Sequence, residues 1–154
     1  MKVVVTSDNH GIDCLNDIAM LHNDASYFFH CGDSLMTEKE LGEYISVRGN
    51  CDYDHDLPLF RIIDVEDHKI LLIHGHRYLE HYDGKYLLAN LAKSNGCDIV
   101  FFGHSHIFSY DEIDGVTLIN PGSLRFNRNE PTRTYALVYF EEGKIRVEKM
   151  YYGR

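Results

Sequence analysis

Five apolar segments of this chain each end in a short cluster of carboxylate, amide or imidazole side chains. The clusters are Asp8-Asn9-His10, Gly32-Asp33, Gly49-Asn50-Cys51-Asp52, His74-Gly75-His76 and Gly103-His104-Ser105-His106. In open α/β sheets, ligands bind beyond the carboxyl ends of the strands. The glycines in or beside these clusters allow a sharp turn, so a side chain can point back across the sheet edge. The pattern therefore predicts one polar site built from five strand ends.

The spacing of apolar residues predicts an α/β fold with two sheets. Strands are expected at residues 2–6, 27–29, 44–47, 60–65, 69–73, 99–102, 107–113, 116–119, 134–140 and 144–150. Helices are expected at residues 13–22, 37–42 and 85–93. Strands and helices alternate in the first two-thirds, whereas hairpins dominate the last third, with Asp114-Gly115 as a strong turn signal. This order favours helices on the sheet faces, with the late strands completing a second sheet packed on the first.

Length and composition indicate one soluble domain spanning residues 1–154. The chain is 44% hydrophobic and has no apolar run long enough to cross a membrane and no signal-peptide core, so we expect a cytoplasmic protein. Its net charge of −9 argues against stable nucleic-acid binding, which requires Lys and Arg to neutralise phosphates. The four cysteines form no CxxC pair and are interpreted as free thiols.

The predicted site combines carboxylate, amide and imidazole groups without clustered thiolates. This set argues against a structural zinc finger. It suits Mn²⁺ better than Ca²⁺, with Ni²⁺, Zn²⁺, Fe, Co²⁺ or Mg²⁺ as alternatives. The candidate ligands are too many for one tetrahedral ion, but they suit two divalent ions that share a bridging carboxylate. Two ions about 3.5–4 Å apart are the usual device for phosphoryl chemistry.

The order of the motifs resembles that of the calcineurin-like metallophosphoesterases. The small bacterial and archaeal phosphodiesterases of the YfcE type are most similar, through Ser7-Asp8-Asn9-His10-Gly11, His74-Gly75-His76 and Asn120-Pro121-Gly122-Ser123. The resemblance covers nearly the whole chain. It implies a four-layer αββα sandwich, in which two mixed β-sheets are flanked by helices.

The resemblance also implies how the motifs share the metal ions. One divalent ion would be held by Asp8, His10 and His106. The second would be held by Asn50, His74 and His104, with Asp33 bridging the two ions. A hydroxide bridging the ions would then attack phosphorus and hydrolyse a small phosphodiester substrate.

Two positions depart from the broader family and leave the general acid open. Cys51 stands where many members have a histidine, and Met36 stands where many have a second aspartate. His76 and Cys51 are the candidate catalytic acids, although a buried cysteine more often serves packing. The lack of a strong acid predicts a preference for good leaving groups, such as activated aryl diesters.

The other polar residues near the motifs are expected to have supporting roles. Asp52 is expected to orient ligands rather than bind metal. Arg125 and Arg128 are candidate contacts for a substrate phosphate, with a solvated loop as the alternative. His30 is expected to be structural. The remaining histidines are interpreted as surface or helix residues: His22, His55, His68 and His81.

Two other functions would use the same fold. The first is a phosphomonoesterase with the same metal centre. The second is a non-catalytic interaction scaffold, as in the retromer subunit that resembles this family but has lost part of the ligand set. The retention of His10, His74, His104 and His106 favours an enzyme. The sequence allows a homo-oligomer without specifying one, and it names neither the native metal nor the substrate.

Overall fold

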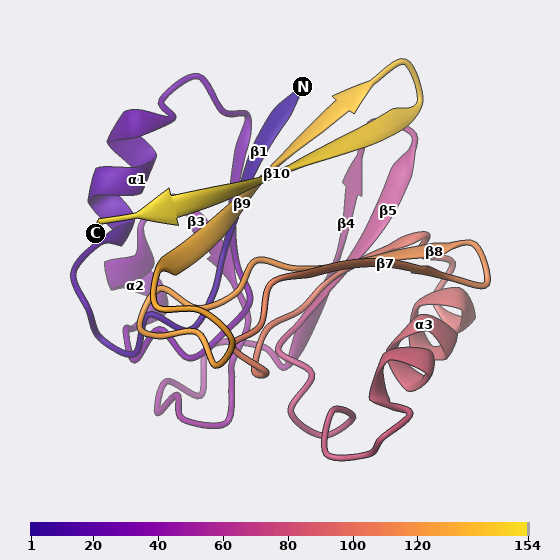
Figure 1. The fold of residues 1–154 in the computed structure, drawn as a ribbon, viewed down its shortest axis with the longest axis horizontal. Helices are drawn as coiled ribbons and strands as arrows, with labels where there is room; N and C mark the ends of the chain where they lie inside the picture. Colours follow the sequence, from indigo (N-terminus) through magenta and orange to yellow (C-terminus); the bar gives the residue numbers. More distant parts are fainter. Residues whose placement is uncertain (154) are drawn as a thin grey trace.

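The protein contains two mixed five-stranded sheets packed face to face, in a computed structural model that describes residues 1–153 (Figure 1). The first sheet has the order β10 (Lys144–Tyr152), β9 (Arg133–Glu141), β1 (Lys2–Thr6), β2 (Tyr27–His30) and β3 (Tyr44–Ser46). The second has the order β4 (Phe60–Val65), β5 (His68–Ile73), β6 (Ile99–Phe101), β8 (Val116–Asn120) and β7 (Ser109–Ile113).

Strand direction brings the predicted clusters to one edge of each sheet. In the first sheet β1, β2 and β3 are parallel to one another. In the second sheet β5, β6 and β8 are parallel. Parallel neighbours end at the same edge of a sheet, so the residues that follow β1, β2 and β3 gather together. The residues that follow β5 and β6 gather in the same way at the edge of the second sheet.

Three apolar layers hold the sheets and helices together. Val3 and Val5 face the core between the sheets, whereas Val4 faces the helices outside, which explains why β1 is apolar throughout. Helices α1 (Leu15–Leu21) and α2 (Glu38–Leu41) cover the outer face of the first sheet, and α3 (Gly84–Ser94) covers the second (Figure 1). The predicted four-layer αββα arrangement is confirmed.

The three helices lie where the spacing predicts them. The expected capping box begins α2, because the Thr37 side chain accepts the Glu40 backbone N–H and the Glu40 carboxylate accepts that of Thr37. Leu88, Ala89 and Ala92 of α3 are buried against the second sheet. Within residues 1–153, no helix has the length and apolar character needed to cross a bilayer.

The predicted start of one strand is wrong. Strand β7 begins at Ser109 rather than at residue 107. The preceding segment pairs with a different loop, since the Arg128 backbone N–H donates to the His106 carbonyl at 3.0 Å. His22, predicted as a surface or helix residue, follows the last residue of α1 and is buried, with its Nε2 2.7 Å from the Tyr135 hydroxyl.

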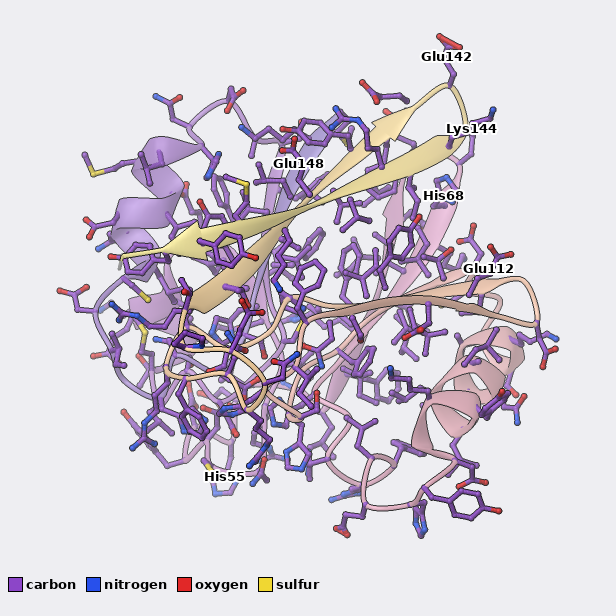
Figure 2. The ribbon with its side chains drawn as sticks, viewed as in Figure 1. His55, His68, Glu112, Glu142, Lys144 and Glu148 are labelled. Carbon is purple, nitrogen blue, oxygen red and sulfur yellow. The ribbon has the colours of Figure 1, made fainter. Side chains whose placement is uncertain are left out.

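Charged side chains cover the outside of the layers. Glu142 and Lys144 project from the β9–β10 turn, and exposed His55 lies at the opposite end of the molecule in the same view (Figure 2). His68 at the start of β5 is half-buried, with Nδ1 2.6 Å from Asp98 Oδ2. This histidine–carboxylate contact is at the end of β5 opposite to His74, so it lies outside the predicted site.

Candidate metal centre

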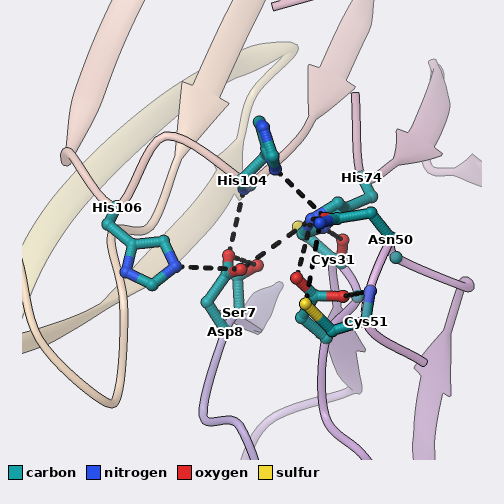
Figure 3. A network of polar contacts seen from close by, with 12 residues as sticks. Ser7, Asp8, Cys31, Asn50, Cys51, His74, His104 and His106 are labelled. Atoms are coloured by element: carbon teal, nitrogen blue, oxygen red, sulfur yellow. Dashed lines mark hydrogen bonds and ion pairs between the residues drawn. The ribbon is translucent and has the colours of Figure 1, made fainter. Parts of the chain in front are cut away.

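The residues that follow five strands meet at one place (Figure 3). The first sheet contributes the side chains of Asp8, His10, Asp33 and Asn50, and the second contributes those of His74, His104 and His106. Ligand atoms of Asp8, His10 and His106 lie within 4.8 Å of one another, as do those of Asp8, Asp33 and His74. The structure therefore brings together residues that are almost a hundred positions apart in the chain.

The backbone of the first two site loops is held in an unusual conformation. Backbone N–H groups of Asp8, His10 and Gly11 donate to carbonyls of residues 32–34 at 2.9–3.1 Å, so the two loops run side by side. Five site residues have a left-handed backbone, with φ from +46° to +72°: Asp8, His10, Asp33, His104 and His106. This conformation is uncommon for residues other than glycine, and it tends to cluster at functional sites. The strained backbone directs these side chains toward the centre of the site.

Two buried carboxylates are surrounded by imidazole Nε2 atoms. His106 Nε2 lies 3.3 Å from Asp8 Oδ1, and His74 Nε2 lies 3.2 Å from Asp33 Oδ2. His10 Nε2 lies 3.6 Å from Asp8 Oδ1 and 3.8 Å from Asp33 Oδ2. Among residues 1–153, no well-aligned hydrogen bond reaches Asp8 Oδ1 or His10 Nε2, although both atoms are buried. Such atoms cost free energy unless they have a partner, and a cation satisfies a carboxylate and an imidazole nitrogen together.

Backbone carbonyls set the tautomer of two of these histidines. His74 Nδ1 lies 2.8 Å from the Cys31 carbonyl, and His106 Nδ1 lies 3.0 Å from the Phe126 carbonyl. A carbonyl only accepts, so Nδ1 carries the hydrogen and donates in each case. Nε2 of each ring then faces the carboxylates, which is the orientation of metal-binding histidines.

Asn50 contacts His74 and His104, the two histidines predicted to share the second ion with it. Its Oδ1 lies 3.0 Å from His74 Nε2 and 3.2 Å from His104 Nδ1 (Figure 3). The His104 backbone N–H also donates to Asp8 Oδ2 at 3.0 Å. Asn50, His74 and His104 thus form one group beside Asp33, as the sequence predicts for the second ion. Their roles as ligands stay predictions.

The charges of the site depend strongly on one another. Burial acts to raise the pKa of Asp8, but the charge of His74 and contacts with His10, His106 and Ser7 hold it well below its usual range. Burial also acts to raise the pKa of Asp33, and His74 lowers it. Burial opposes the charged form of His74, yet the two carboxylates raise its pKa to about 9. Both carboxylates are therefore ionised and need positive charge, which divalent cations would supply.

Asp52 ties the loops after β2 and β3 together. Its Oδ2 accepts the backbone N–H groups of Asp33 and Gly49 at 2.8 and 2.7 Å. Its Oδ1 accepts the backbone N–H of Leu35 at 2.9 Å. The carboxylate is thus occupied by three backbone donors, which suits the orienting role expected for Asp52.

His30 joins the loops after β1 and β2. Its Nδ1 accepts the Gly32 backbone N–H at 3.0 Å, so this nitrogen carries the lone pair. Its Nε2 then carries the hydrogen and donates to Asn9 Oδ1 at 2.8 Å. Asn9 lies between two predicted ligands, and the expected structural role of His30 is to fix that segment against the next loop.

Sequence reasoning assigned no role to three residues that hold Asp8 and its surroundings. The Ser7 hydroxyl donates to Asp8 Oδ2 at 2.5 Å, and the Ser123 hydroxyl donates to the Asp8 carbonyl at 2.8 Å. Asn120 Nδ2 donates to the Gly103 carbonyl at 3.1 Å. The motif Asn120-Pro121-Gly122-Ser123 was the available signal, because its polar residues follow strand β8 as the other motifs follow theirs.

Two glycines allow the loops to approach the carboxylates. A Cβ atom at Gly103 would lie 2.1 Å from Ser7 Oγ and 2.7 Å from Asp8 Oδ2. A Cβ atom at Gly49 would lie 2.2 Å from Asp33 Oδ1. These distances are shorter than any van der Waals contact, so only glycine fits at either position.

The two candidate acids lie at the edge of the centre. Burial and the charges of His74 and His104 lower the pKa of His76, which leaves its imidazole mostly neutral at pH 7. Burial and Asp33 raise the pKa of the Cys51 thiol. The Cys51 sulfur lies within 4.8 Å of ligand atoms of His10 and Asp33. His76 therefore mostly lacks a proton to give at neutral pH, and the Cys51 thiol releases its proton poorly. Neither side chain is an effective general acid there.

The two predicted substrate arginines flank one aromatic ring. Guanidinium carbons of Arg125 and Arg128 lie 5.9 and 5.8 Å from the centre of the Phe126 ring, and that ring packs 4.7 Å from the His106 ring. Arg128 Nε donates to the Ser105 carbonyl at 2.9 Å, so Arg128 also supports the loop that carries His104 and His106. Contact with a substrate stays a prediction for both arginines.

The whole arrangement matches a known family. A family model described as the calcineurin-like phosphoesterase superfamily domain matches residues 1–143. The chain belongs to this superfamily. The family description and relatives named as probable metallophosphoesterases imply divalent ions at the cluster of carboxylates and imidazoles.

Relatives within the calcineurin-like superfamily match most of the chain. A probable metallophosphoesterase of Bacillus subtilis is 36% identical over 148 residues, covering 92% of this chain and 85% of the relative. A phosphodiesterase of Methanocaldococcus jannaschii is 30% identical over 145 residues, covering 79% of this chain and 83% of the relative. Both relatives support a phosphoesterase.

Solved structures confirm the calcineurin-like fold. A conserved protein of Streptococcus pneumoniae, described as a predicted phosphoesterase, superimposes with a TM-score of 0.89 at 24% identity and covers 97% of this chain and 88% of that one. Vps29 of Entamoeba histolytica, in a complex with zinc, superimposes with a TM-score of 0.75 at 21% identity and covers 99% of this chain and 100% of that one. These structures show the fold alone.

Proposed function

We propose that the protein is a binuclear metal-dependent phosphodiesterase. The observation that carries this proposal is the set of Nε2 atoms and carboxylate oxygens that face one another at the meeting point of the two sheets. Asp8, His10 and His106 would hold one ion, Asn50, His74 and His104 would hold the other, and Asp33 would lie between them. Mn²⁺ is the first candidate for this mixed oxygen and imidazole set.

Bound ions would activate a water and neutralise the charge that develops on the phosphorus oxygens. The chain itself keeps both carboxylates ionised and holds the Nε2 atoms of His74 and His106 directed inward. The Asp52 carboxylate, which accepts backbone N–H groups of the neighbouring loops, and the side chain of His30 keep the loops from moving apart. This preorganisation saves the cost of arranging the ligands during the reaction.

A diester is the proposed substrate rather than a monoester. The phosphodiesterase of Methanocaldococcus jannaschii supports this choice by similarity. Cys51 and His76 supply no strong acid, so leaving groups that need little protonation should react fastest. Activated aryl diesters are therefore the first substrates to assay.

A scaffold without catalysis is the second candidate, because Vps29 shares the fold. Metal binding alone does not separate the two functions, since the Entamoeba histolytica Vps29 structure itself holds zinc. Hydrolysis separates them. Full occupancy by Mn²⁺ without turnover of any ester would favour the scaffold.

The decisive experiment is hydrolysis of bis(p-nitrophenyl) phosphate and p-nitrophenyl phosphate by Mn²⁺-loaded protein. Faster turnover of the diester is expected, with near-complete loss in Asp33→Asn and His74→Ala. His68→Ala is the matched control, because it removes a carboxylate-bound histidine from the other end of the same strand. Activity that survives in both site variants would refute the assignment of the centre.

A further inference from the structure

A cavity of about 180 Å³ lies beside the metal centre, between α3 and the start of β4. Its wall is mainly apolar and includes Phe60, Ile73, Tyr78 and Leu91. Phe60 is 48% exposed although it begins a strand of the second sheet. An apolar hollow with an exposed aromatic side chain at its wall favours an apolar group as the occupant.

The volume limits what the cavity can hold. An apolar cavity of about 150 Å³ is large enough to bind benzene, whereas pockets for drug-sized ligands measure about 300–1,000 Å³. A cavity of about 180 Å³ therefore fits one six-membered ring and not a fused pair of rings.

His76 connects this cavity to the centre. Its side chain lines the cavity, and its ring centre lies 5.5 Å from that of His74 and 6.2 Å from that of His104. Its Nδ1 atom is buried and has no hydrogen-bond partner among residues 1–153. A ring in the cavity would thus point its polar substituent toward His76 and the predicted ligands of the second ion.

We infer that this cavity is the subsite for a single aryl ring of the phosphate ester, with His76 positioning the ester group beside the second ion. The inference rests on the proposed function and adds the substrate class. It commits the enzyme to esters with at least one small aromatic substituent.

Calorimetry on the Mn²⁺-loaded protein tests the subsite without requiring turnover. Phenylphosphonate and methylphosphonate are the probes, since they share the anionic group and differ in the ring. Wild-type protein should bind phenylphosphonate at least roughly tenfold more tightly, because the ring leaves water. A ratio near one would overturn the inference.

Variants of α3 test the location. Leu91→Trp should fill the cavity and bring the ratio of phenylphosphonate to methylphosphonate affinity close to one. Leu87→Trp is the matched control, because Leu87 is also half-buried, lies one turn earlier in the helix and does not line the cavity. Leu91→Ala should widen the cavity and shift the preference from phenylphosphonate to naphthylphosphonate. An unchanged ratio in both Leu91 variants, each folded by circular dichroism, would overturn the inference.

The subsite and the proposed function can fail separately. Aryl preference in binding with no hydrolysis of any ester would keep the subsite and reject the enzyme. Hydrolysis of diesters without preference for a ring, in binding or in kcat/KM, would keep the enzyme and reject the subsite.

Discussion

Acid should destabilise this protein through one buried histidine. His30 is fully buried, and burial lowers its pKa from 6.5 to about 4. Protonation would place a hydrogen on Nδ1, which faces the Gly32 N–H and now accepts from it. Two donors would then face each other inside the core, so protonation of His30 is unfavourable in the folded state. The variant His30→Asn removes the titrating group while keeping a polar side chain.

The sign and size of the effect follow from linkage. The pKa of His30 is lower in the folded than in the unfolded chain, so the unfolded state binds more protons as the pH falls. The contribution of neutral His30 is present above pH 6.5 and is lost as the pH falls toward 4. The difference between 6.5 and about 4 corresponds to about 3 kcal/mol of unfolding free energy, at about 1.4 kcal/mol for each pH unit.

Urea unfolding of the metal-free protein at pH 7 and pH 4.5 measures this directly. Wild-type protein should lose roughly 2 kcal/mol more unfolding free energy between the two pH values than His30→Asn does, because pH 4.5 lies near the lower end of the range between the unfolded and folded pKa values of His30. His81→Asn, which removes an exposed imidazole, should behave like the wild type. Equal losses in the wild type and His30→Asn would show that His30 does not resist protonation in the folded chain.

Three further substitutions test the frame of the centre. Asp52→Asn places an amide against one of three backbone donors, so it should cost about 2 kcal/mol in urea unfolding and weaken Mn²⁺ binding. Asp54→Asn, an exposed carboxylate that accepts two backbone donors in the same loop, is the control and should leave Mn²⁺ affinity unchanged. Gly103→Ala should abolish Mn²⁺ binding in calorimetry, and adding Ser7→Gly should restore part of it by removing the closest clash. Cys51→His should raise the alkyl-to-aryl ratio of kcat/KM roughly tenfold or more if it supplies the absent acid, and an unchanged ratio would exclude that role for position 51.

The sequence predicts most strands and the convergence of the polar motifs because both depend on local patterns, whereas the four-layer arrangement is implied by the resemblance to the calcineurin-like family. Alternating or continuous apolar residues identify strands over a few positions, and a polar motif directly after a strand needs no knowledge of the rest of the chain. Asp8, Asp33 and His74 could therefore be selected before any strand was placed. The neighbouring order β1-β2-β3 then brought their motifs together.

The supporting contacts could not be predicted because they depend on distant registers. Ser123 reaches the Asp8 carbonyl across 115 positions, and His30 contacts Asn9 across 21. The late start of β7 depends on Arg128 in another loop, because the Arg128 backbone N–H donates to the His106 carbonyl in the segment before the strand. The cavity beside His76 exists only after α3 is packed against the second sheet. Such features follow from the assembled structure rather than from any segment.

The central place of β1 has a consequence for biosynthesis. This strand is synthesised long before one of its two neighbours, because it is flanked by β2 on one side and by β9 (Arg133–Glu141) on the other. The strand that leads to Asp8 therefore keeps an open edge until β9 has been synthesised. His104 and His106 also follow the other predicted ligands in the chain, so each of the two predicted ions lacks one ligand until they are synthesised. The predicted centre can thus be completed only after both sheets have contributed their strands.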